Sequence, residues 1–336
     1  MSVCKRHCIS FALAFFSASP LFADHPSVAF GNEASGAINT ISSAPIVARS
    51  WSFGLRSEII ENDAFSSSQL ESFASAGIEG VHSVDKIVST SVTLNVGLTA
   101  NTSISARLPY VKRTNIREGE LEEGNPEAHS HGDSAGLGDL LLVGRHQLIA
   151  NSKLHASVLF GVKTPTGETD LTDSGGIRFE TESQPGSGSW DYLLGASISA
   201  NQGNLGYHAS LIYNMTTEGS QSTQIGDAMS YGAALTYRLP HNHDSHNHDD
   251  LTATNSGKLQ FDLSLELNGE TRRRNEIAGV SEQHSGGTSL TLSPGIRVSS
   301  KKISGFISYG LPLHNSHKGK QTDIESRLVA GLSLAI

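Results

Sequence analysis

The sequence predicts an all-β fold, a single transmembrane antiparallel β-barrel of about 12 strands and of the bacterial outer-membrane type. Three observations lead to it: a secretory signal at the N-terminus, apolar and polar residues that alternate along most of the chain, and short connections that alternate with long ones. Only 37% of the 336 residues are hydrophobic, whereas a packed soluble domain has about 45–50%. After residue 23 no apolar run is long enough for a helical membrane span.

The first element is a signal peptide over residues 1–23. Two basic residues precede an apolar stretch, and small residues lead up to Ala23, after which we expect cleavage; a short membrane anchor is the alternative. Cys4 and Cys8 both lie in this segment, so the mature chain is expected to contain no disulfide bond and no thiolate. Residues 24–47 are small and polar, and we expect them to form an N-terminal periplasmic segment or a plug.

The barrel is expected over residues 48–336, where alternation with a period of two gives each strand one apolar and one polar face. Most of the alternating segments reach the length of a tilted strand that crosses a bilayer. The expected strands cover residues 48–60, 86–100, 102–116, 136–149, 153–164, 188–200, 205–216, 227–239, 258–269, 287–299, 302–313 and 323–336. We expect the apolar side chains to face lipid and the polar ones the lumen, for example Leu94, Leu211, Leu263 and Leu332 against Asn95, Thr236 and Asp262.

The connections alternate in length, as periplasmic turns and extracellular loops do in outer-membrane barrels. Short connections lie at residues 101, 150–152, 201–204 and 300–301, and long ones at 61–85, 117–135, 165–187, 217–226, 270–286 and 314–322. Because the expected number of strands is even, both termini are expected in the periplasm. The first long connection is expected to contain a short helix over residues 65–76, since Ser66 and Gln69 have the spacing of a capping box.

The connection over residues 240–256 is long where a short periplasmic turn is expected. It contains four histidines and three aspartates, a nitrogen and oxygen donor set that Zn, Cu, Ni and Co accept. Two further histidines lie in an acidic long connection. The expected metal ligands are His241, His243, Asp244, His246, His248, Asp249, Asp250, His129 and His131. A solvated low-complexity linker is the alternative to a metal-binding role.

Charged residues of both signs fall on the polar faces of the expected strands. Twelve strands leave a narrow lumen, so these side chains either lock the interior through ion pairs or line a polar path. The expected lumen-lining residues are Arg56, Glu58, Arg107, Lys163, Asp191, Arg238, Asp262, Glu266 and Arg297.

The sequence favours a protein that is not an enzyme. The glycine- and serine-rich segment 186–189 is not a nucleophile elbow, because no strand-to-helix turn surrounds it. Outer-membrane hydrolases use Ser/His or Asp/His sets, but no spacing pairs His155 or His208 with a nucleophile. The formal net charge of −9 also argues against nucleic-acid binding.

Five short motifs resemble a known family of bacterial outer-membrane proteins, the MetA-pathway of phenol degradation family. The motifs are RLPYV at 107–111, NIREGE at 115–120, GLGDL at 136–140, GVKTPTG at 161–167 and QPGSGSWD at 184–191, and the resemblance covers most of the chain after about residue 45. It implies a single outer-membrane barrel with a role in solute passage, and it supplies no catalytic residues. The His-rich connection favours a metal-associated member over one that serves aromatic compounds.

We therefore expect an outer-membrane barrel for the passage or capture of a small solute, with divalent transition-metal ions as the favoured solute. A channel for small aromatic or apolar compounds is the first alternative, and a structural or sensory barrel without transport is the second. The expected partners are the outer-membrane lipid bilayer and the barrel-insertion machinery, because Gly331, Leu334 and Ile336 resemble a C-terminal insertion signal.

Overall fold

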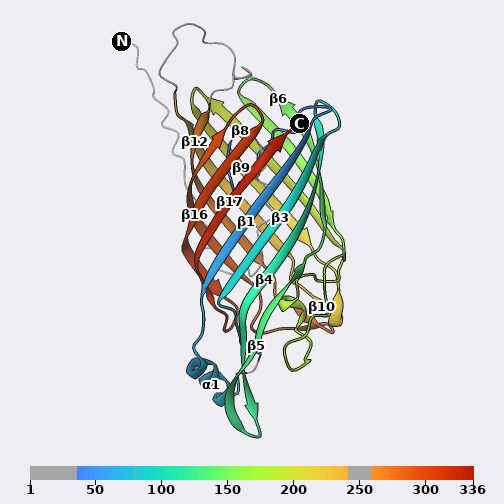
Figure 1. Ribbon diagram of the computed structural model, residues 1–336, viewed down its shortest axis with the longest axis vertical. Coiled ribbons are helices and arrows are strands. Elements are labelled where there is room, and N and C mark those ends of the chain that lie inside the picture. The colour runs from blue at the N-terminus through green and yellow to red at the C-terminus, as the bar shows by residue number, and fades with distance from the viewer. Residues whose placement is uncertain (1–35, 79, 241–258) are drawn as a thin grey trace, which may run out of the picture.

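The computed structural model describes residues 36–78, 80–240 and 259–336, and these form a closed antiparallel barrel (Figure 1). The expected signal peptide and the His-rich stretch 241–250 lie outside the described residues. Within the described part, twelve strands form the barrel wall, and the last pairs with the first, which confirms the predicted fold class. The wall strands are β1 (Trp51–Asp63), β3 (Lys86–Gly97), β4 (Thr102–Glu122), β6 (Leu141–Ala150), β7 (Leu154–Lys163), β8 (Asp191–Gln202), β9 (Leu205–Met215), β11 (Ala228–Arg238), β12 (Gln260–Arg272), β15 (Gly287–Ser299), β16 (Ile303–His317) and β17 (Asp323–Ala335).

The helix expected in the first long connection is confirmed as α1 (Ser67–Ser75). The Ser66 hydroxyl accepts a hydrogen bond from the Gln69 N–H, and the Gln69 side chain accepts one from the Ser66 N–H, so the capping box is complete. The helix lies at the end of the barrel that carries the long loops, against the extension of β4 (Figure 1).

The long connection expected over residues 117–135 is a β-hairpin. Strand β4 continues to Glu122, β5 (Asn125–Leu137) pairs along its outer half, and the next wall strand begins at Leu141 instead of residue 136. The hairpin projects beyond the barrel (Figure 1). A strand outside the membrane needs no apolar face, so its residues do not have to alternate between apolar and polar. For this reason the sequence of residues 117–135 predicted a loop. The remaining short strands are β2 (His82–Ser83), β10 (Thr223–Gln224), β13 (Glu276–Ile277) and β14 (Val280–Ser281).

The two faces of the wall have opposite chemistry. On the outer face Leu211 and Leu332 are 50% and 60% exposed, whereas Asn95 and Asp262 on the inner face are 3% and 4% exposed. Leu94 and Leu263 also point outward and Thr236 inward, as expected. An apolar outer belt with polar side chains inside is the arrangement of a barrel whose surroundings are lipid. No helix among the described residues is long and apolar enough to cross a membrane.

This orientation predicts a face-dependent cost for a new charge. Changing Leu211 to Arg should lower the free energy of unfolding in lipid vesicles by roughly 2–4 kcal/mol, because the guanidinium would lie in the hydrocarbon region. The control is Ser230→Arg on the paired strand, where Ser230 faces the lumen and donates a hydrogen bond to Glu270. Its cost should be clearly smaller. Equal losses in urea titrations of the two variants would contradict the assignment of the faces.

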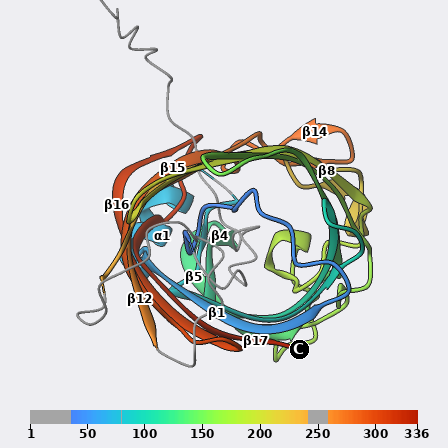
Figure 2. The same ribbon diagram turned by 90° about the horizontal axis from the view of Figure 1, so that it is seen from above.

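Residues 36–47, here called the lumenal segment, run inside the barrel, where the end-on view shows them in blue (Figure 2). Residues 37–43 are all buried. Ile38 packs against Phe306 and Val329 of the wall, and Ile41 belongs to an apolar cluster with residues of β6, β7, β8 and β9. The part of residues 24–47 that the structure describes is therefore enclosed by the wall down to about residue 43.

Candidate functional site

Glu266 on β12 holds the lumenal segment by its backbone. Its carboxylate accepts hydrogen bonds from the N–H groups of Ile38, Asn39 and Thr40 at 2.6, 2.9 and 2.7 Å. Glu266 is fully buried, and a buried carboxylate is stable only when such donors replace its water. Three successive amides that converge on one carboxylate fix both the position and the register of the segment.

Two arginines bind the carbonyl groups of the same part of the segment. Arg56 Nη1 donates to the Ile38 carbonyl at 3.1 Å, and Arg297 Nη2 donates to the Ala37 carbonyl at 3.1 Å. The guanidinium carbons of Arg56 and Arg297 lie 5.8 and 4.9 Å from the centre of the Phe306 ring, within the range of a cation–π interaction. Acidic and basic side chains of the wall thus bind the donors and acceptors of one backbone segment.

From residue 41 onward the lumenal segment bonds to the opposite wall. Ser210 on β9 accepts a hydrogen bond from the Ile41 N–H at 3.2 Å, and Arg145 on β6 donates one to the Ala44 carbonyl at 2.5 Å. Hydroxyl groups of the wall also bond to this part of the segment, and they belong to Ser157, Ser197 and Ser199. The segment therefore crosses the lumen from β12 to β6.

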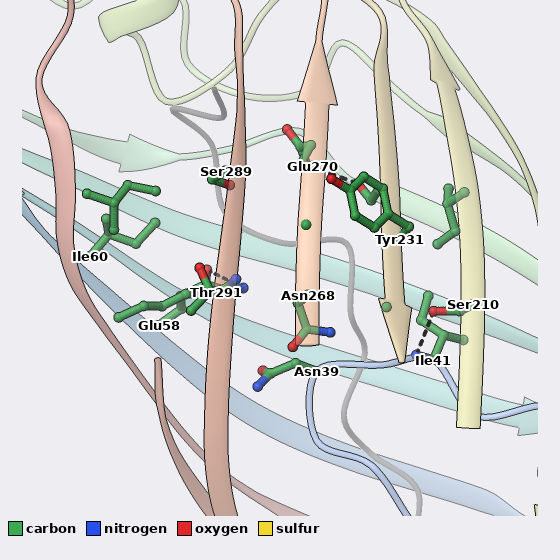
Figure 3. A pocket seen from close by; sticks show the side chains of 16 residues that line it. Asn39, Ile41, Glu58, Ile60, Ser210, Tyr231, Asn268, Glu270, Ser289 and Thr291 are labelled. Atoms are coloured by element: carbon green, nitrogen blue, oxygen red, sulfur yellow. Dashed lines mark hydrogen bonds and ion pairs between the residues drawn. The ribbon is translucent and has the colours of Figure 1, made fainter. Parts of the chain in front are cut away.

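A small cavity of about 60 Å³ lies beside the lumenal segment (Figure 3). Asn39 and Ile41 of the segment form one side of it, and Glu58 and Ile60 of β1 contribute to another. Glu58 pairs with Arg327 on β17 at 2.8 Å, so its buried charge is compensated. This space remains between the segment and the wall and is too small for more than a few water molecules.

Three motif segments meet around Lys163, at the long-loop end of β7. Lys163 Nζ lies 2.7 Å from Asp139 Oδ2 and 3.1 Å from Asp191 Oδ2, and both carboxylates are nearly buried. The ammonium also donates to the hydroxyls of Ser187 and Ser189. Two buried carboxylates with one ammonium form a network in which every charge depends on the others. Lysine and serines of the GVKTPTG and QPGSGSWD motifs therefore share one centre with the aspartate of GLGDL.

Residues 165–187, here called the inward loop, lie over the mouth of the barrel (Figure 2). The Lys163 centre anchors this loop. Asp139 accepts hydrogen bonds from the N–H groups of Gly167 and Ser187 at 2.9 and 3.0 Å. A Cβ atom on Gly167 would come within 2.7 Å of the Gly186 Cα atom, so the two ends of the loop pack at glycine distance. The loop is thereby fixed at both of its ends.

A cavity of about 190 Å³ lies under the inward loop and exposes more apolar than polar surface. Its apolar lining comes from Val111, Leu141, Pro185 and Ile225. Its charged lining has both signs: the basic residues include Arg107, Lys163 and Arg272, and the acidic ones are Asp139, Glu182 and Asp191. Sites for small organic molecules combine apolar surface with polar groups that orient the ligand, and this cavity offers both, with polar and charged residues in the majority of its lining.

His82 on β2 lies at the long-loop end among three carboxylates. Its Nε2 atom is 3.1 Å from Glu118 and 3.7 Å from Glu180, and its Nδ1 atom is 3.5 Å from Glu182. Burial alone would lower the pKa of His82, but the hydrogen bond with Glu118 and the charges of the three glutamates outweigh burial and raise the pKa to about 10. Burial and the charge of Glu180 also raise the pKa of the nearby Glu282, because carboxylates at the long-loop end lie close enough to repel one another.

The structure describes most of the site residues that the sequence predicts. All nine expected lumen-lining residues lie on inner faces of the wall, and the salt bridges favour locking of the interior: Lys163 pairs with Asp191, Arg238 pairs with Asp262 at 2.9 Å, and Glu58 pairs with Arg327. His129 lies 3.5 Å from Glu122 near the hairpin tip, whereas His131 lies 3.2 Å from Asp173 and 3.7 Å from Glu118. The expected ligands between residues 241 and 250 lie outside the described residues.

His208 has two hydroxyl partners that the sequence did not indicate. Its Nδ1 atom lies 3.0 Å from Ser199 Oγ, and its Nε2 atom lies 3.2 Å from Thr236 Oγ1. The Ser199 hydroxyl also accepts the hydrogen bond from the Ser43 N–H. The pair therefore lies where the lumenal segment meets the wall, while His155 bonds to Gln147.

Several residues of the site were not expected from the sequence, among them Asp139, His82, Glu180 and Glu182. Asp139 lies in the GLGDL motif, for which the sequence indicated no role. His82, Glu180 and Glu182 come from two long connections, and no spacing in the sequence joins them.

The family model for the MetA-pathway of phenol degradation matches residues 72–302. This range includes the Lys163 centre, the inward loop and Glu266. No curated protein matches the chain.

Among solved structures, the chain is similar to an outer membrane channel from Pseudomonas putida F1, with 16% identity and a TM-score of 0.52 over 88% of this chain and 98% of that one. LpxR from Salmonella typhimurium matches with 12% identity and a TM-score of 0.42 over 84% of this chain and 99% of that one. The CymD monoaromatic hydrocarbon channel matches with 10% identity and a TM-score of 0.40 over 86% and 88% of the two chains. The first likeness supports the fold of an outer-membrane barrel.

Proposed function

The chain belongs to the MetA-pathway of phenol degradation family, and we propose that it is an outer-membrane channel through which small aromatic or apolar compounds pass. The fold shared with an outer membrane channel supports passage, and the family description supports the aromatic class. This proposal replaces the passage of transition-metal ions, which the sequence favoured, because neither the family nor the fold likeness points to a metal.

The proposal rests on the lining of the cavity under the inward loop. A phenol-like solute has a flat apolar body and one polar group. Val111, Leu141 and Ile225 offer an apolar surface for such a body, while Arg107 and Lys163 lie on the same cavity for the polar group. A channel for ions or sugars would need a continuous wetted path, whereas this cavity favours a solute that leaves water readily.

Two obstacles lie in series along the proposed route. A solute that enters at the long-loop end meets the inward loop first, then the cavity, and then the lumenal segment. Both obstacles are held by hydrogen bonds and ion pairs within the described residues, so each can be displaced without breaking a covalent bond. We propose that the lumenal segment acts as the plug, with the long-loop end outside the cell and the short-turn end in the periplasm.

Filling the cavity should block passage. Leu141 faces the cavity on β6, and Leu141→Trp should slow the uptake of labelled phenol by cells several-fold, because the larger ring occupies the space of the solute. The matched control is Leu142→Trp, since the neighbouring leucine pairs with Val162 and points outward. An aromatic side chain on the lipid face is well tolerated in barrels.

Heat-modifiable migration on gels should report both variants as folded, and uptake through the Leu142→Trp barrel should equal that of the wild type. Unchanged uptake through a folded Leu141→Trp barrel would remove the cavity from the route. Equal losses in the two variants would point to a general defect of the barrel.

A further inference from the structure

The long-loop end contains a compact group of metal-binding side chains that the proposed solute route does not use. It is here called the mouth cluster, and its members are His82, Glu118, Glu180 and Glu182. Ligating atoms of His82, Glu180 and Glu182 all lie within 4.8 Å of one another. Glu118 faces the same imidazole at 3.1 Å. The cluster thus brings one nitrogen donor and several oxygen donors into the space of a single coordination sphere.

The members come from three separate parts of the chain. His82 lies on β2, between α1 and β3, and Glu118 lies on the extension of β4 that pairs with it. Glu180 and Glu182 lie on the inward loop. The imidazole and Glu118 are each 14% exposed, while Glu180 is 49% exposed. His82 and Glu118 therefore form the buried floor of the site. The side at Glu180 is open to solvent, and an ion can enter there.

His131 extends the cluster. Its Nε2 atom lies 3.7 Å from the Glu118 oxygen that also faces His82, and its other nitrogen lies 3.2 Å from Asp173 on the inward loop. A carboxylate that accepts a hydrogen bond from the second ring nitrogen of a ligating histidine orients the ring, and such carboxylates are common at metal sites. The described residues hold a second group of suitable donors, Glu122, Glu127 and His129, but its two glutamates are exposed at the hairpin tip.

We propose that the mouth cluster binds one divalent transition-metal ion, Zn²⁺ in the simplest case, through an imidazole nitrogen of His82 and the carboxylates of Glu180 and Glu182, with Glu118 as a further ligand or support. On binding, the ion displaces to solvent the proton that this imidazole nitrogen carries among the three carboxylates. The mixed nitrogen and oxygen donor set favours zinc-like ions over Mg²⁺ and Ca²⁺, which prefer oxygen alone. Because a bound ion would join β2 to the inward loop, it would hold the loop over the cavity. The ion site does not depend on which solute crosses the barrel.

The test is calorimetric titration of Zn²⁺ into the purified full-length barrel in detergent. To remove competition from the His-rich connection, every barrel carries His241, His243, His246 and His248 changed to Ala. The parent should bind one Zn²⁺ and bind Ca²⁺ much more weakly. His82→Ala should lose at least the roughly 10–100-fold in affinity that the loss of a supporting group alone costs at metal sites. His129→Ala is the matched control and should bind as the parent does.

Glu180→Gln is a second variant. The Glu180 side chain is 49% exposed and the change keeps its size, so the barrel should fold as the parent does while Zn²⁺ binding weakens. Zn²⁺ should also slow hydrogen exchange of residues 165–187 in the parent but not in His82→Ala. No uptake by the parent would overturn the proposal. Equal uptake by the parent and His82→Ala, or a loss caused by His129→Ala instead, would overturn it too.

Discussion

Replacing Glu266 by Ala should release the lumenal segment and raise the ion conductance of the barrel several-fold. The change removes the acceptor of three buried backbone N–H bonds, to Ile38, Asn39 and Thr40. Hydrogen bonds to a charged group contribute roughly 1.5–3 kcal/mol each, and the three amides would be left without their partner in the interior. The segment should then spend much of its time out of the lumen. Single-channel recording in planar bilayers measures this directly.

Asp262→Asn is the control for Glu266→Ala. Asp262 is an equally buried acid on the same strand, but it pairs with Arg238 of the neighbouring strand. Its replacement should leave the conductance near that of the wild type. If both variants conducted alike, the effect would come from the loss of any lumenal charge and not from release of the segment. Unchanged conductance in Glu266→Ala would contradict the role of the segment as a plug.

Replacing Lys163 by Met should unfasten the inward loop. The ammonium is the shared partner of Asp139 and Asp191, and removing one partner of a buried ion pair costs roughly 3–5 kcal/mol, since the remaining charge stays buried and unpaired. The loss should be local, because the barrel strands keep their own ladders. We expect hydrogen exchange of residues 165–187 to become much faster, while exchange of the wall strands stays slow.

Lys112→Met is the matched control for this second prediction. Lys112 makes one ion pair with Asp133 on the hairpin, and the two side chains are 47% and 42% exposed. Exposed pairs contribute little to stability, so exchange of the inward loop should not change. A Lys163→Met barrel whose inward loop exchanged as slowly as that of the wild type would show that the glycine packing alone holds the loop.

The wall of the barrel could be predicted from the sequence because lipid imposes one simple pattern. Each strand must show an apolar side chain at every second position, and the run from Val88 to Ala100 already shows it. The hairpin of β4 and β5 was missed for the converse reason. Beyond the barrel no face has to be apolar, so a strand there leaves no trace in the alternation.

The candidate site could be predicted only in part. The alternation assigns Lys163 and Glu266 to the polar faces of their strands, and these faces point inward in the structure. Their partners do not follow, since Glu266 binds backbone groups 226 to 228 residues away, and backbone amides have no sequence signature. His82 was missed because a single histidine in a loop carries no spacing that indicates a ligand.

Uptake of labelled phenol by cells that lack other porins is the most direct test of passage through the lumen. Cells with the wild-type barrel should take up phenol faster than cells without it. The uptake of a neutral polar solute of similar size by the same cells should stay unchanged. Both solutes must displace the inward loop and the lumenal segment, but only the aromatic ring gains from contact with the apolar surface of the cavity. Phenol uptake that is the same with and without the barrel would contradict the account.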